Sequence, residues 1–233
     1  MGNLLRVLFL FFFLGVFSSF GSSVKDFEQQ SSERVSICKK FLNSGSHKEI
    51  PYNCRLIDGK FLAGGNLFNP ETHQNSSEQI LRQLKFLKEF GVSSVILLHV
   101  PLGKDKEIAD LERFCQRERL KIYKFRMTSE KVPTPSETKE ILSLLNNGAY
   151  VHCMWGCDRT GSIIAKYLRT KKGYTGEQAW RAVITGGSHS GSKGGFKQTP
   201  SYKNLVLYFW PEVPFENMEV CRIYDLSFNP SSR

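Results

Sequence analysis

Residues 149–161 read AYVHCMWGCDRTG and combine a short strand pattern, a tight loop and the start of a helix. An apolar run ends at His152 and Cys153, and five residues separate Cys153 from Arg159. Thr160 then opens a segment in which apolar residues recur at helical spacing. This order predicts a thiol that lies beneath backbone N–H groups, at the positive end of a helix dipole. Such a setting binds anions and favours the thiolate form of cysteine.

The spacing His-Cys, five residues, Arg-Thr-Gly resembles the signature of the cysteine-dependent phosphatases, the protein tyrosine and dual-specificity phosphatase superfamily. The variant Gly-x-Asp-Arg-Thr-Gly is most similar to the compact bacterial dual-specificity-like branch, and it is also similar to the loops of phosphoinositide-directed members. The resemblance implies a dual-specificity phosphatase-like α/β fold. It also implies a phosphoester hydrolase that works through a phosphocysteine intermediate on phosphotyrosine, phosphoserine, phosphothreonine or phosphoinositide substrates.

The chemistry of phosphate esters and the resemblance together suggest a role for each residue of the loop. Cys153 is the predicted nucleophile, and Arg159 is predicted to bind the phosphoryl group through two N–H groups. Thr160 is expected to donate a hydrogen bond to the cysteine sulfur, and His152 to orient the cysteine. The loop backbone supplies the other donors, with a glycine at its third position to allow the turn. The predicted substrate-binding residues are Met154, Trp155, Gly156, Cys157, Asp158 and Arg159.

The proton donor for the leaving group has two candidates. The superfamily usually places an Asp on a mobile loop before the cysteine, but residues 127–133 contain none. Glu130 lies in that segment and is one candidate. Asp158 is the other and is favoured, because its place in the loop fixes it within reach of the leaving oxygen. Myotubularin-like phosphatases carry an Asp at this position. An ion pair with Arg159, or a contact with a neighbouring amide, is the alternative role for Asp158.

Other functions also fit parts of this pattern. The missing Asp suits a catalytically inactive phosphate-binding module of the same fold. A redox or metal protein built on His152, Cys153 and Cys157 is a further hypothesis, but Cys-x3-Cys with one adjacent His lacks a second pair of ligands. We therefore expect no cofactor and no metal. Nucleic-acid binding is disfavoured because the chain has no motif that interleaves aromatic and basic residues.

The composition excludes a disordered or fibrous protein. The chain has 233 residues, of which 40% are hydrophobic and 23% charged, and this length suits one domain with a sizeable core. The net charge of +10 is consistent with a phosphorylated protein, an anionic lipid or an inositol phosphate as substrate. A basic surface also serves solubility, and the charge alone does not separate these explanations. We expect a monomer.

The first residues are typical of a secretory signal peptide. Arg6 precedes an almost unbroken apolar run over residues 7–17, and small residues follow it. The run is too short for a comfortable membrane span, so we expect a secreted or periplasmic protein with no span after signal removal. An uncleaved N-terminal anchor is the alternative. The expected divisions are a signal peptide (1–21), a polar extension (22–53), a phosphatase domain (54–215) and a C-terminal tail (216–233).

Six cysteines are present, and an oxidising compartment would allow some of them to pair. Cys38 with Cys54 closes the most natural short loop, although spacing does not fix the connectivity. Cys157 lies four positions after Cys153, where it could trap the nucleophile as a disulfide. A buried, apolar thiol is the favoured interpretation of Cys157, because so tight a loop restricts disulfide geometry.

The remaining sequence predicts strands that alternate with helices early and helices that cluster late. Asp58 and Gly59 form a two-residue hairpin signal between two short strands. This order predicts an α/β sandwich with a central, largely parallel sheet flanked by helices. The expected strands are 55–57, 60–63, 95–100, 121–127 and 150–151. The expected helices are 76–90, 105–119, 135–147, 160–172, 177–184 and 199–210.

Overall fold

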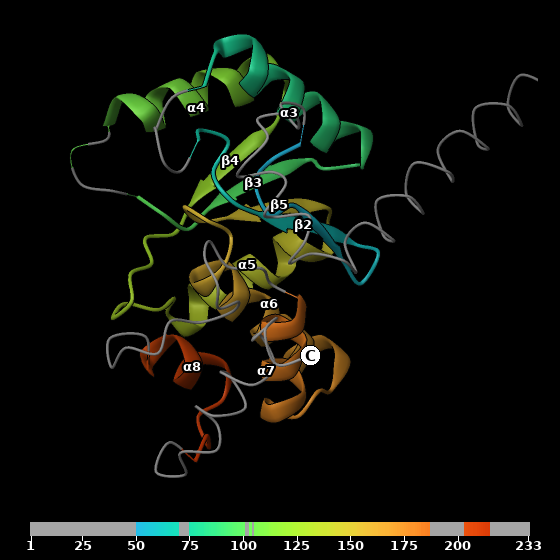
Figure 1. The fold of residues 1–233 in the computed structure, drawn as a ribbon, viewed down its shortest axis with the longest axis vertical. Coiled ribbons are helices and arrows are strands. Elements are labelled where there is room, and N and C mark those ends of the chain that lie inside the picture. The colour runs from blue at the N-terminus through green and yellow to red at the C-terminus, as the bar shows by residue number, and fades with distance from the viewer. Residues whose placement is uncertain (1–49, 70–74, 101–102, 104, 187–202, 215–233) are drawn as a thin grey trace, which may run out of the picture.

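The structure is a computed structural model that describes residues 50–69, 75–100, 103, 105–186 and 203–214. The predicted signal peptide and nearly all of the predicted extension lie outside these residues. A five-stranded sheet with the order β1-β2-β5-β3-β4 forms the centre (Figure 1). Strands β2, β5, β3 and β4 are parallel to one another, and β1 is antiparallel to β2. The prediction of a largely parallel central sheet is therefore confirmed. The strands are β1 (Arg55–Ile57), β2 (Phe61–Gly64), β3 (Ser94–Leu97), β4 (Lys121–Lys124) and β5 (Ala149–His152).

Helices cover both faces of the sheet, as Figure 1 shows. Helices α3 (Ser77–Glu89) and α4 (Asp105–Arg117) lie on one face. Helices α5 (Pro135–Asn146), α6 (Asp158–Lys172), α7 (Gly176–Gly186) and α8 (Lys203–Phe209) lie on the other. Alternate residues of each strand enter different cores, because successive side chains of a strand point to opposite faces. The core beneath α3 and α4 includes Leu62, Val95, Leu97 and Tyr150, and the core beneath α5 to α8 includes Ala63, Ile96, Val151 and Ile163.

The predicted hairpin is present, and local contacts cap two of the helices. Asp58 (φ 53°) and Gly59 (φ 62°) both adopt the left-handed conformation that the two-residue turn between β1 and β2 requires. The backbone N–H of Glu137 donates to the Thr134 hydroxyl at 3.2 Å, and the Glu137 carboxylate accepts from the Thr134 N–H at 2.7 Å. This reciprocal pair is a capping box at the start of α5. Gly173 ends α6 in the left-handed conformation, which glycine adopts readily.

Several element boundaries differ from those expected by one to three residues. Strands β3 and β4 end at Leu97 and Lys124, before the predicted ends at 100 and 127. The backbone N–H groups of Phe125 and Met127 still donate to carbonyls of the neighbouring chain segment, so pairing continues less regularly. Helix α6 begins at Asp158, two residues before the predicted start, because the loop turns directly into the helix. The predicted start of the last helix, at residue 199, lies outside the described residues, and α8 is described from Lys203.

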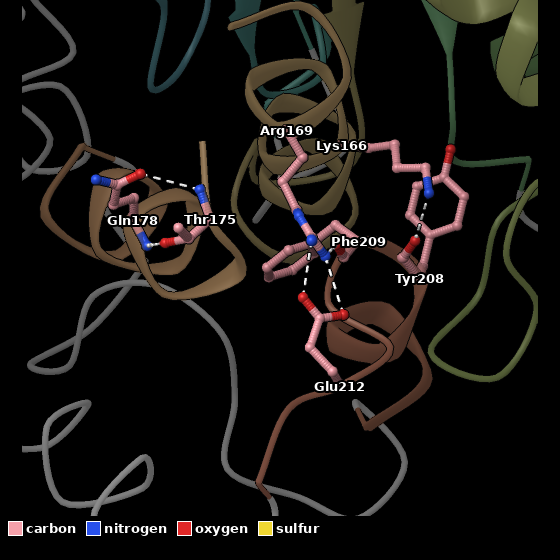
Figure 2. Close-up of polar contacts among 7 residues, drawn as sticks. All are labelled: Lys166, Arg169, Thr175, Gln178, Tyr208, Phe209 and Glu212. Atoms are coloured by element: carbon pink, nitrogen blue, oxygen red, sulfur yellow. Dashed lines mark hydrogen bonds and ion pairs between the residues drawn. The ribbon is translucent and has the colours of Figure 1, made fainter. Parts of the chain in front are cut away.

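Polar contacts join α8 to α6, and two hydrogen bonds cap the start of α7 (Figure 2). Lys166 of α6 donates to the Tyr208 carbonyl at 3.1 Å, and Arg169 donates to the Phe209 carbonyl at 2.7 Å. Arg169 also forms an ion pair with Glu212 at 2.7 Å. These donors satisfy carbonyls at the C-terminal end of α8, which have no partner within the helix. At the start of α7, Thr175 and Gln178 cap each other reciprocally.

Within the described part of the chain, no helix combines the length and the apolar character that crossing a membrane requires.

Candidate active site

Cys153 follows β5 directly and is only 3% exposed. Strand β5 lies between β2 and β3 in the sheet, so Cys153 emerges at the carboxyl edge between two parallel neighbours. Five residues later the chain enters α6, and the Gly161 N–H donates to the Cys157 carbonyl at 2.6 Å as a first helical bond. The N–H groups that precede Gly161 in this first turn lack intrahelical acceptors and are available to bind an anion. The predicted strand, loop and helix therefore occur in the predicted order.

The loop after Cys153 rests on a second turn, at the end of β2. The Asn66 N–H donates to the Met154 carbonyl at 2.9 Å. Gly156 has a φ of 73°, and a Cβ added to it would lie 2.3 Å from the Gly64 carbonyl carbon and 2.6 Å from the Gly65 nitrogen. Glycine is therefore required at this position both for the backbone conformation and for the close approach of two backbones.

Two buried side chains contact the same loop from beneath. Asn53 Nδ2 lies 3.3 Å from the Trp155 carbonyl and 3.1 Å from the Gly156 carbonyl. Arg55 Nη2 donates to the Gly156 carbonyl at 2.9 Å. A planar trans peptide points its C=O and the following N–H in opposite directions. The N–H groups of the residues after Trp155 and Gly156 therefore point away from Asn53 and Arg55. Sequence reasoning missed both residues.

Arg159 is the second residue of α6 and is half-buried. Its Nη1 atom lies 2.5 Å from Nδ1 of His99, which follows β3 at the same edge of the sheet. An arginine side chain can only donate, so Nδ1 of His99 is the acceptor and its ring is neutral in this arrangement. Sequence reasoning treated His99 only as part of an apolar strand. The signal available in the sequence was a histidine near the end of an apolar run that predicts a buried strand.

Thr160 is fully buried, and its hydroxyl donates to the Gly64 carbonyl at 3.4 Å. The hydroxyl therefore joins α6 to the turn beneath the loop. The hydrogen bond expected from Thr160 to the Cys153 sulfur stays a prediction.

His152 is fully buried, and its ring stacks on Tyr150 with 5.4 Å between the ring centroids. Burial lowers the pKa of His152 to about 4, and a hydrogen bond with the Cys153 carbonyl opposes that shift. At neutral pH the ring is therefore neutral, and its Nδ1–H donates to the Cys153 carbonyl at 3.3 Å. A neutral ring that donates to the backbone of the cysteine is the arrangement that an orienting residue requires.

The two predicted proton donors occupy different settings. Asp158 is half-buried and is the first residue of α6, directly before Arg159. Glu130 is exposed on a separate turn, where its N–H donates to the Thr128 hydroxyl at 3.1 Å. Its carbonyl accepts from Asn204 at 3.2 Å. The loop thus brings Asp158 together with the residues predicted for the site, whereas Glu130 belongs to another segment.

No disulfide joins any two of the four cysteines that the structure describes, which are Cys54, Cys115, Cys153 and Cys157. Cys157 is buried, and its sulfur lies 3.6 Å from Asn53 Nδ2 and 3.5 Å from the Trp155 carbonyl. The pairing expected for Cys54 involves Cys38, which lies outside the described residues. Among the residues that the structure describes, no three His, Cys, Asp or Glu side chains are grouped so that they could hold a metal ion.

No protein-family model matches this sequence, and no curated protein matches it. Among solved structures, it is similar to a mutant form of Tk-PTP, with 14% identity, a TM-score of 0.50, and 70% of this chain and 97% of that chain covered. PTPMT1 gives 18% identity, a TM-score of 0.49, and 71% and 99% coverage. TpbA of P. aeruginosa gives 13% identity, a TM-score of 0.47, and 77% and 99% coverage. The chain therefore has the fold of the cysteine-dependent protein tyrosine and dual-specificity phosphatases.

Proposed function

We propose that the protein hydrolyses phosphate monoesters through a phosphocysteine intermediate. The observation that carries the proposal is the position of Cys153, directly after the central strand and in a loop where the N–H groups of Gly156 and Cys157 face away from the side chains beneath it. Arg159 lies at the start of the following helix, where it can place a planar guanidinium against phosphoryl oxygens.

In the proposed first step, the Cys153 sulfur attacks phosphorus and the bond from phosphorus to the leaving oxygen breaks. The leaving oxygen takes a proton, for which Asp158 is the proposed donor. In the second step, water gives a proton to the Asp158 carboxylate and attacks phosphorus, the phosphorus–sulfur bond breaks, and inorganic phosphate and the Cys153 thiolate are released. The loop N–H groups and Arg159 stabilise the equatorial oxygens in both steps, where most of the transition-state charge lies.

The proposed substrates are phosphorylated proteins or phosphoinositides. The net charge of +10 supports an anionic substrate in either class. A panel of phosphotyrosine, phosphoserine and phosphothreonine peptides, phosphoinositides in vesicles and free inositol phosphates would rank the classes by kcat/KM. Preference for a peptide over every phosphoinositide would assign the protein class, and the reverse order would assign the lipid class.

The test of the reaction is turnover of p-nitrophenyl phosphate by the full chain and by Cys153→Ser. We expect the serine variant to lose at least about a thousandfold in kcat, because a serine hydroxyl is a much weaker nucleophile than a cysteine thiolate. Cys115→Ala is the matched control, because it removes another buried thiol, on α4, outside the loop. Turnover retained by Cys153→Ser would contradict the proposed mechanism.

The second candidate is a phosphate-binding module without turnover. The observation that favours it is the absence of Asp from residues 127–133 together with the exposed position of Glu130. Binding of inorganic phosphate by a well-folded protein that turns over no member of the substrate panel would select this candidate.

We also propose that the chain is exported, because residues 1–21 have the layout of a signal peptide. N-terminal sequencing of the mature protein tests this, with cleavage after about residue 21 expected. A mature chain that retains residues 1–21 would favour the N-terminal anchor instead.

A further inference from the structure

Asn53 and Arg55 lie beneath the loop of residues 153–159, and none of the proposed chemical steps uses them. They are 5% and 1% exposed. About a hundred residues separate them from the loop in sequence, since the contacts of Arg55 and Asn53 with Gly156 span 101 and 103 positions. Pairing of β1 with β2, and of β2 with β5, brings the two segments together. A buried arginine requires compensating hydrogen bonds, so its partners indicate what it does there.

Arg55 connects Asn53 to the loop. Its Nη1 donates to the Asn53 carbonyl at 2.9 Å, and its Nη2 donates to the Gly156 carbonyl at 2.9 Å. The Asn53 side chain then reaches the carbonyls of both Trp155 and Gly156. Asn53 has a φ of 50°, a left-handed conformation that asparagine tolerates better than most residues. Both side chains thus contact the Gly156 carbonyl, and Asn53 also contacts the Trp155 carbonyl.

Fixing these carbonyls also fixes the N–H groups on the opposite side of each peptide plane. The N–H that follows the Trp155 carbonyl belongs to Gly156, and the N–H that follows the Gly156 carbonyl belongs to Cys157. Without donors beneath the loop, these peptide planes could rotate and lose their alignment toward a bound anion. Arg55 also places a positive charge behind the loop, where the buried setting weakens solvent screening.

We propose that Asn53 and Arg55 are positioning residues that hold the loop in its anion-binding conformation, and that Arg55 adds a buried positive charge behind the bound phosphoryl group. This inference rests on the proposed function of the same loop. It assigns no direct contact with substrate to either residue. Its consequence is that affinity for inorganic phosphate depends on two side chains beneath the site.

The experiment measures binding of inorganic phosphate to the full chain by titration calorimetry, together with kcat and KM for p-nitrophenyl phosphate. Arg55→Met removes the charge and both donors at similar volume, and we expect affinity for phosphate to fall by about tenfold or more. Arg55→Lys retains the charge and one donor group, so it should recover part of that loss. Asn53→Gly removes the side-chain amide without strain at a positive φ, and we expect a loss of about fivefold.

Thr138→Val is the matched control. It removes a buried hydroxyl of α5 and its hydrogen bond of 2.9 Å with the Tyr208 hydroxyl, outside the loop. We expect this variant to lower the melting temperature while leaving phosphate affinity unchanged. A general loss of stability would therefore be distinguished from a loss of loop positioning.

Unchanged phosphate affinity in Arg55→Met, with or without a lower melting temperature, would overturn the inference. If Arg55→Met does not fold, the test uses Arg55→Lys and Asn53→Gly instead. Wild-type affinity for inorganic phosphate in both of these variants would overturn the inference. The proposed function fails separately, when the wild-type chain binds phosphate but turns over no phosphoester. In that case the phosphate titrations of the variants still test whether Asn53 and Arg55 position the loop.

Discussion

The Nη1 atom of Arg159 lies 2.5 Å from Nδ1 of His99, so the ring that follows β3 holds the guanidinium proposed to bind the phosphoryl group. This contact uses one nitrogen and leaves the other N–H groups of the guanidinium for substrate oxygens. We predict that His99→Ala lowers kcat/KM for p-nitrophenyl phosphate by about tenfold, because Arg159 loses the acceptor that orders its side chain. His99→Asn retains an acceptor and should lose less.

The control for His99 is Ser93→Ala, which changes an exposed residue just before the opposite end of β3. The Ser93 hydroxyl donates to the Asn147 carbonyl at 3.1 Å, so the control also removes a hydrogen bond. A rise of kcat/KM in His99→Ala would contradict the prediction. It would mean that His99 holds Arg159 away from the phosphoryl group.

Gly156 and Gly173 have nearly the same backbone conformation, with φ of 73° and 69°, but different surroundings. Alanine at Gly156 would overlap the backbone of Gly64, whereas a Cβ at Gly173 would meet no atom of a non-adjacent described residue within 4 Å. We predict that Gly173→Ala costs only the strain of a left-handed alanine, about 1 kcal/mol of unfolding free energy. Gly156→Ala should cost about 3 kcal/mol or more, because the two backbones must separate, and should abolish binding of inorganic phosphate.

Urea denaturation of both glycine variants, followed by phosphate titration, measures the two effects. Equal losses of stability would show that the turn of residues 64–66 can move aside. Full phosphate affinity in Gly156→Ala would show that the loop binds phosphate without its contact with that turn.

Local sequence signals predicted the elements whose cause is local. The turn at Asp58 and Gly59 depends on two adjacent residues, and the capping box depends on Thr134 and a glutamate three positions later. The order of strand, loop and helix around Cys153 was predictable for the same reason. Apolar runs gave the strands, but they did not mark where the regular hydrogen bonding of β3 and β4 ends.

The partners of the loop were not predictable, because they depend on which strands are neighbours. Arg55 reaches Gly156 only because β2 pairs with β5, and His99 reaches Arg159 because β3 lies on the other side of β5. Nothing in a single sequence fixes that strand order. The double glycine at the end of β2, Gly64 and Gly65, was a local sign of a close backbone approach.

Burial lowers the pKa of His152 from about 6.5 to about 4, which makes folding sensitive to acid. Between these two pH values the unfolded chain binds a proton that the folded chain does not. The free energy of unfolding therefore decreases as the pH falls, and His152 contributes up to about 1.4 kcal/mol of this decrease per pH unit. We predict that His152→Gln has a flatter dependence of unfolding free energy on pH between about 6.5 and 4.

Chemical denaturation of the wild type and His152→Gln at several values between pH 7 and pH 4 tests this. The carboxylates titrate in both proteins, so the difference between the two curves isolates His152. Parallel curves would contradict the prediction, because they would mean that the folded chain protonates His152 as readily as the unfolded chain does.

Asp158 lies beside Arg159 at the start of α6, whereas Glu130 lies on another segment. We therefore expect substitution of Asp158, and not of Glu130, to lower the rate of hydrolysis. A proton donor matters most when the leaving oxygen is basic. We predict that Asp158→Asn lowers kcat for an alkyl phosphate by about a hundredfold while changing kcat for p-nitrophenyl phosphate by less than about fivefold. Glu130→Gln should leave both rates unchanged, because Glu130 lies on an exposed turn outside the loop.

Asp110→Asn is the control for charge, because it removes an aspartate on α4 that pairs with Arg113 at 2.8 Å. Equal losses with both leaving groups in Asp158→Asn would mean that Asp158 organises the loop or Arg159 and donates no proton. A loss in Glu130→Gln that is confined to the alkyl phosphate would assign the donor to Glu130. That result would also require the turn around Glu130 to approach the loop during turnover, because a proton donor must come within hydrogen-bond reach of the leaving oxygen.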